Sequence, residues 1–136
     1  MTLKYLLDTN IISDLVRNPQ GVIAEHIADV GERSVCTNII VASELRYGAF
    51  KSGSKRLTDQ VGYILSALEV LPLEEPIDHH YALIRHQLTT NGTPIGPNDL
   101  IIAAHALERK LTIVTANIRE FLRVPGLPIE NWLDQG

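Results

Sequence analysis

The chain has little of three things: cysteine, net positive charge and uninterrupted apolar sequence. Its single cysteine, Cys36, excludes an intramolecular disulfide. No apolar stretch approaches the ~20 residues that a membrane-spanning helix needs, and the N-terminal residues lack the features of a secretory signal. We therefore expect a cytoplasmic protein that has no membrane partner.

The charge balance limits how the chain can bind nucleic acid. A formal net charge of −4 argues against a broadly basic surface, but it allows a local one. Residues 46–56 contain no acid and four cations, which are Arg46, Lys51, Lys55 and Arg56. Such a run is either the solvated end of a helix with its loop or a patch that contacts phosphates.

A short strand that ends in a carboxylate organises the rest of the sequence. A short apolar run typical of a buried strand consists of Leu3, Tyr5, Leu6 and Leu7, and a polar break at residues 8–10 follows. We expect Asn10 to cap a helix that begins at Ile11, which leaves Asp8 in the strand-to-helix loop, where open α/β sheets place their ligands. The alternative is that Asp8 is only a turn residue or a helix cap.

The order of strand, polar break and helix occurs twice more. A strand over residues 34–37 leads through Asn38 into a helix over 39–50, and a strand over 111–115 leads through Asn117 into another helix. A short strand around Pro72 is limited by that proline to a sheet edge or a strand end. This alternation predicts a single α/β domain built on a central parallel sheet, whose strand ends gather along one edge.

Three acids are expected to reach that edge. Asp8 follows the first strand, Glu44 lies on an apolar stripe of its helix, and Asp99 stands at the entrance of a helix over residues 100–107. Without neighbouring lysine or arginine, these charges would repel one another unless a hard divalent cation neutralised them. Oxygen ligands favour Mg²⁺ or Mn²⁺, which can promote phosphodiester hydrolysis. The alternative for Asp99 is an acid placed favourably on a helix dipole.

Four segments carry a resemblance to a known family. Residues 6–12, 43–49, 95–103 and 114–121, in this order and spacing, resemble the VapC toxins of the PIN-domain ribonucleases, and the match spans nearly the whole chain. The resemblance implies a PIN-like domain over residues 1–136, an α/β/α sandwich. It also implies a Mg²⁺-dependent endoribonuclease that cleaves structured RNA such as tRNA and so inhibits translation. Further implications are a VapB-type antitoxin that neutralises the toxin, and a homodimer.

The resemblance also assigns roles to residues. Metal binding and catalysis fall on Asp8, Glu44 and Asp99. Asn117 stands where many PIN domains have a fourth acid; its amide keeps an oxygen for a metal or its water but removes one charge. Thr115 is expected to position a water. The four cations of residues 46–56 are expected to contact the RNA backbone.

Three rival functions fit parts of the sequence. An aspartate-nucleophile phosphatase would use Asp8, but it needs a lysine after a later strand, and Lys110 precedes the last one. A phosphorylated receiver module needs paired acids after its first strand and a lysine after its last, and both are missing. A PIN domain that only binds RNA stays open because of Asn117, and metal-dependent cleavage separates it from an enzyme.

Overall fold

A computed structural model describes residues 2–134 of the chain. All strands in it are parallel and form one five-stranded sheet in the order β3-β2-β1-β4-β5. The predicted α/β fold with a parallel sheet is therefore confirmed, and the strand before Pro72 lies at the edge, as its proline requires. The strands are β1 (Tyr5–Leu7), β2 (Val35–Asn38), β3 (Glu69–Leu71), β4 (Thr112–Val114) and β5 (Ile129–Glu130).

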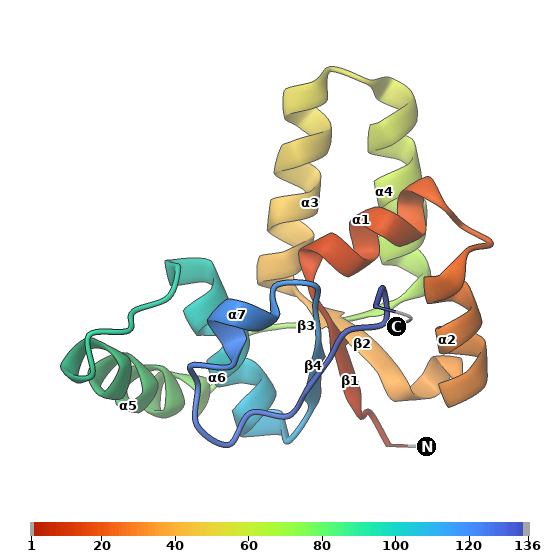
Figure 1. The fold of residues 1–136 in the computed structure, drawn as a ribbon. Helices are drawn as coiled ribbons and strands as arrows, with labels where there is room; N and C mark the ends of the chain where they lie inside the picture. The colour runs from red at the N-terminus through yellow and green to blue at the C-terminus, as the bar shows by residue number, and fades with distance from the viewer. Residues whose placement is uncertain (1, 135–136) are drawn as a thin grey trace.

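Helices cover both faces of this sheet. In Figure 1, α5 and α6 lie to one side of the strands and α1 and α2 to the other, so the molecule is an α/β/α sandwich. Within residues 2–134 no helix is long and apolar enough to cross a membrane. The helices are α1 (Thr9–Arg17), α2 (Val22–Val30), α3 (Ile39–Ser52), α4 (Lys55–Ala67), α5 (Ile77–Thr90), α6 (Pro97–Arg109) and α7 (Ile118–Phe121), with a 3-10 turn η1 (Glu32–Ser34).

The central strand β1 and helix α6 form much of the core. Leu6 and Leu7 have no exposed surface, which agrees with a strand that is covered on both faces. On α6, Ile102, Ala103, Ala104 and Ala106 have no exposed surface. The helix is therefore packed into the core, which holds its first turn in place relative to the sheet.

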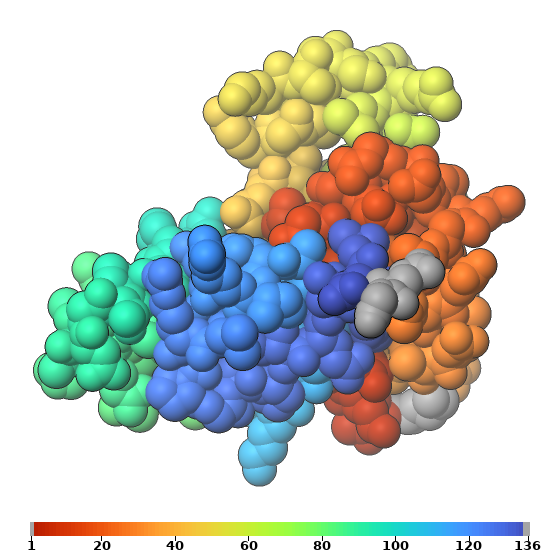
Figure 2. All heavy atoms as spheres, in the orientation of Figure 1, coloured from red at the N-terminus to blue at the C-terminus, as the bar shows by residue number. Residues whose placement is uncertain are grey.

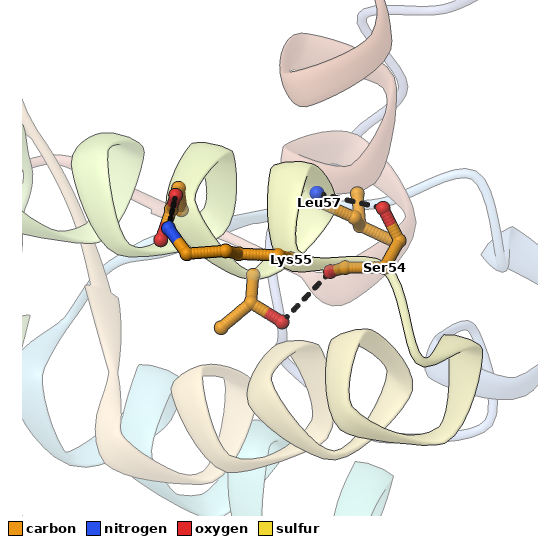
Figure 3. A network of polar contacts seen from close by, with 5 residues as sticks. Ser54, Lys55 and Leu57 are labelled. Carbon is orange, nitrogen blue, oxygen red and sulfur yellow. Dashed lines mark hydrogen bonds and ion pairs between the residues drawn. The ribbon is translucent and has the colours of Figure 1, made fainter.

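Helices α3 and α4 form a hairpin that projects from the body of the molecule (Figure 2). Gly53 makes the turn at a φ of +71°, a left-handed conformation that favours glycine. Ser54 then caps α4, because its hydroxyl accepts a hydrogen bond from Leu57 N at 3.1 Å (Figure 3). The sequence at the turn therefore determines where α3 ends and α4 begins.

The expected start of α1 is wrong by two residues. The helix begins at Thr9, and Asp8 is its N-cap, accepting a hydrogen bond from Thr9 N at 2.8 Å. Asn10 does not cap α1, because its Oδ1 accepts a hydrogen bond from Ala116 N, at 2.8 Å, in the turn after β4. A tertiary contact replaces the local one, and it ties the start of α1 to the end of β4.

Candidate active site

The predicted acids lie where three helices begin. Asp8 joins β1 to α1, Glu44 lies in the second turn of α3, and Asp99 lies in the first turn of α6. Thr115 and Asn117 occupy the turn between β4 and α7. Because β1 and β4 are adjacent and parallel, their carboxyl ends bring these segments together at one edge of the sheet.

Asp8 is nearly inaccessible to solvent, with 3% of its surface exposed. Its carboxylate accepts hydrogen bonds from Thr9 N at 2.8 Å, from the Thr115 hydroxyl at 2.8 Å and from Asn10 Nδ2 at 3.3 Å. Burial raises the pKa of Asp8, while these hydrogen bonds oppose the rise. The protein thus holds a buried carboxylate in a fixed position, and a cation at this carboxylate would favour its charged form.

Thr115 contacts Asp8 directly. Its side chain is fully buried, and its hydroxyl both donates to Asp8 Oδ2 and accepts a hydrogen bond from Asn117 N at 2.9 Å. The hydroxyl thus holds Asp8 and the turn that carries Asn117 in place, and its expected role in positioning a water stays a prediction.

Glu44 lies at the rim of the site. Its Oε1 accepts a short hydrogen bond from the Thr9 hydroxyl at 2.6 Å, and its Oε2 accepts a longer one from Asn98 Nδ2 at 3.4 Å. The expected burial on an apolar stripe is only partly correct: Val41 is fully buried, but Glu44 is half-buried and 67% of Tyr47 is exposed. The helix has an exposed face here because it extends beyond the sheet into the projecting hairpin.

A fourth carboxylate, which sequence reasoning missed, belongs to Glu120. The Nδ2 of Asn117 donates to Asp99 Oδ2 at 3.2 Å and to Glu120 Oε2 at 3.1 Å. The Asn117 amide therefore faces these acids with its nitrogen, not with the oxygen that was expected to serve a metal. The available signal was the spacing, because Glu120 follows Asn117 by three residues at the start of a helix, which places both side chains on one face.

Asp99 and Glu120 share one proton. Burial, followed by the hydrogen bond and charge of Glu120, raises the pKa of Asp99 to about 8. The pKa of Glu120 is lowered, first of all by its hydrogen bond with Asp99. At neutral pH the pair therefore carries about one negative charge, and a bound cation would displace the shared proton.

The composition of the site fits a hard divalent cation. Within residues 2–134 the ion pairs are Arg17 with Asp14 and Lys55 with Asp59, so none of the four acids contacts a cation, and the charge of Arg123 acts on Glu120 from a longer distance. The four side chains offer only carboxylate oxygens as metal ligands, and Mg²⁺ and Mn²⁺ prefer oxygen ligands. In the same part of the chain, no group of three or more His, Cys, Asp or Glu side chains is placed so that it could hold a metal ion. The ligand roles of Asp8, Glu44 and Asp99 therefore stay predictions.

The basic residues are not brought to the acids. Arg46 lies just beyond Glu44 on α3, while Lys51, Lys55 and Arg56 lie at the tip of the hairpin. All four are exposed. The Lys55 ammonium is paired with Asp59 at 2.9 Å (Figure 3), and both side chains are solvated, so this ion pair contributes little to stability.

The variant Glu120→Gln tests the shared proton. Removing the charge of Glu120 is expected to lower the pKa of Asp99 from about 8, because one of the groups that raise it becomes neutral. Carboxyl carbon chemical shifts followed between pH 5 and 9 in metal-free protein measure this directly. An Asp99 titration with the same midpoint in both proteins would contradict the pairing.

Comparison with known proteins agrees with this geometry. The PIN domain family matches residues 5–127. The tRNA(fMet)-specific endonuclease VapC of Salmonella typhimurium (strain LT2) is 40% identical over 131 residues, which cover 96% of this chain and 98% of that protein. Ribonuclease VapC2 of Rickettsia felis is 35% identical over 130 residues, covering 94% of this chain and 97% of that protein.

Solved structures show the same similarity. The crystal structure of VapBC2 from Rickettsia felis, bound to a DNA fragment from its promoter, contains a chain that superposes with a TM-score of 0.89 at 33% identity, covering 96% of this chain and 99% of that one. DNA-bound VapBC from Salmonella typhimurium gives a TM-score of 0.85 at 38% identity, with coverage of 96% and 99%.

Proposed function

This chain belongs to the PIN-domain family and, within it, to the VapC ribonucleases, and from that premise we propose that it is a Mg²⁺-dependent endoribonuclease toxin. Its proposed reaction is hydrolysis of phosphodiester bonds in structured RNA such as tRNA, with inhibition of translation as the result. Asp8, Glu44 and Asp99 would hold the cation, and Glu120 supplies a further carboxylate. The observation that carries this proposal is the convergence of four acids without a paired cation.

The protein's own residues prepare this chemistry. The bound cation would make an attacking water more acidic and stabilise the charge that develops on the phosphate. Thr115 and Asn10 hold the Asp8 carboxylate, and Thr9 holds that of Glu44. The Asn117 amide holds Asp99 and Glu120 against each other. The relative orientation of the acids is thus determined before substrate binds.

Removing the metal should abolish cleavage. Purified protein incubated with total bacterial RNA and Mg²⁺ is expected to give a few discrete cuts, which EDTA suppresses by about a hundredfold or more and excess Mg²⁺ restores. The measurement is the mapping of new 5′ ends by sequencing. RNA that is bound but never cut, with every metal tried, would instead favour an RNA-binding module without catalysis.

A VapB-type antitoxin is the proposed protein partner. A groove of about 340 Å³ beside the acids is bounded by α1, α3 and α4 and has an apolar floor that includes Val16, Leu45 and Val61. Because Thr9 and Glu44 also line it, a segment lying in this groove would reach the active site. Adding the cognate antitoxin should therefore suppress RNA cleavage, and uninhibited cleavage by the purified complex would contradict this arrangement.

The remaining parts of the proposal concern location, assembly and RNA contacts. We place the protein in the cytoplasm as a homodimer, which light scattering of the purified chain tests directly. The exposed cations Arg46, Lys51, Lys55 and Arg56 are proposed to contact RNA phosphates on the projecting hairpin.

A further inference from the structure

A cavity outside the acidic cluster has the properties of a nucleobase site. It lies between α5 and the segment that leads into α6, and its volume is about 240 Å³. Figure 1 shows this segment passing from the end of α5 to the start of α6, where Asp99 lies. The residues that shape the cavity are mostly apolar, and they include Tyr81, Arg85 and Leu88 from α5 with Pro94, Ile95 and Pro97 from the segment.

Tyr81 and Arg85 form a prearranged pair in the cavity wall. Arg85 Nη1 donates a hydrogen bond to the Tyr81 hydroxyl at 2.9 Å, and its guanidinium carbon lies 5.9 Å from the centre of the Tyr81 ring. Arg85 is exposed and forms none of the ion pairs found within residues 2–134. The cavity thus combines a planar ring with a positive charge that forms no ion pair with a carboxylate of the described residues.

The cavity and the acidic cluster share a wall. Gly96 lies between two cavity-lining residues, Ile95 and Pro97, and its backbone N–H is hydrogen bonded to the Glu120 carboxylate. A side-chain carbon at Gly96 would lie 3.9 Å from Asp99 Oδ2, which is van der Waals contact. The wall is also anchored, because Arg123 Nη1 donates to Pro94 O at 2.7 Å and Thr93 N donates to Leu88 O at 2.9 Å. One short segment therefore lines the cavity through Ile95 and Pro97 and contacts the acidic cluster through Gly96.

We propose that this cavity binds one unpaired nucleobase of the RNA substrate, with Tyr81 stacking on the base and Arg85 contacting an adjacent phosphate. The assignment rests on the proposed ribonuclease function and adds a specificity site to it. Single-stranded bases are recognised in proteins by stacking on aromatic rings and guanidinium planes, and the flanking phosphates by cations. The exposed cation favours a polyanionic strand over an apolar peptide as the occupant.

Binding of RNA without cleavage tests the subsite. The probes are single-stranded octaribonucleotides that carry 2-aminopurine at successive positions, mixed with the full chain and Ca²⁺ in place of Mg²⁺. We expect quenching at one position, because the base stacks on Tyr81. Tyr81→Leu keeps apolar volume but should abolish this quenching and weaken binding about tenfold. Arg85→Gln should weaken binding severalfold and lower the salt dependence by about one phosphate contact.

The matched control is Tyr63→Leu, which removes an exposed tyrosine on α4, far along the chain from the cavity, and should change neither quenching nor affinity. Absence of quenching at every position, or the same quenching and affinity in Tyr81→Leu and Arg85→Gln as in wild type, would overturn the subsite. Cleavage of total RNA by wild type judges the ribonuclease proposal separately. If wild type cleaves RNA, and Tyr81→Leu and Arg85→Gln cleave it at the same positions and rates, the subsite is rejected and the ribonuclease proposal stays intact.

Discussion

Replacing Asp8 with asparagine is expected to lower the rate of RNA cleavage by about a thousandfold, while the melting temperature changes little. Asp8 is 3% exposed, and burial disfavours its charged form, so a neutral amide of the same shape removes that energetic cost. The amide nitrogen would also face a group that now donates to Asp8, so the loss of a hydrogen bond offsets this gain. The same change removes the negative charge around which the candidate metal site is built. Activity should therefore fall far more than stability.

Cleavage of an oligoribonucleotide that spans a mapped cut measures the first effect, and thermal unfolding followed by circular dichroism measures the second. Asp29→Asn is the matched control, because Asp29 is an exposed acid on α2 and lies outside the site. It should leave both quantities unchanged. An Asp8→Asn protein that cuts within threefold of the wild-type rate would remove Asp8 from the catalytic machinery.

Local patterns were sufficient to predict the fold and the edge of the sheet at which the candidate site lies. The apolar run that ends at Asp8, the capping residue Asn38 and the buried strand before Thr115 each mark a place where a strand stops and a helix starts. Parallel strands have their carboxyl ends at one edge, so these three places had to lie together. The order of the segments was therefore enough to bring Asp8, Thr115 and Asn117 to one edge of the sheet.

Side-chain partners could not be predicted in the same way, because they depend on contacts between segments distant in sequence. Asn10 has the composition of a helix cap, yet its side chain bonds to the turn at Ala116, 106 residues away, and Asp8 takes its place. Glu120 was overlooked because Asn117 already filled the expected position. Only the structure shows that the amide donates to Asp99 and Glu120 together. Residue type gives the capacity to hydrogen bond, and the fold decides which partner is used.

A buried histidine connects two helices that supply these acids. His105 on α6 is 1% exposed, and its Nδ1 lies 3.0 Å from Nδ2 of Asn38, the N-cap of α3. Asn38 Oδ1 accepts a hydrogen bond from Val41 N at 2.9 Å, so the amide orientation is determined and its Nδ2 must donate to His105. Nδ1 of His105 is therefore the unprotonated acceptor. Protonation would set two donors against each other in a buried place.

The stability of the protein should consequently fall in acid through His105. Burial, assisted by the positive charge of Arg109, lowers the pKa of His105 to about 4 from its ordinary value of 6.5. Between these pH values the unfolded chain binds a proton that the folded chain does not, so the free energy of unfolding decreases as pH falls from 6.5 to 4. The full loss is about 3 kcal/mol, and below pH 4 it does not grow further.

The variant His105→Gln isolates this contribution, because its amide oxygen can still accept from Asn38 but has no proton to gain. Asp8 and Asp99 have raised pKa values and act in the opposite direction, since their protonation stabilises the folded state as pH falls. Subtracting the variant's curve from that of wild type removes both acids from the comparison. Urea unfolding at pH 7.5 and 4.5 should show a larger loss of stability for wild type. Parallel losses in the two proteins would mean that His105 is protonated in the folded state, and that α3 and α6 are not joined through a neutral imidazole.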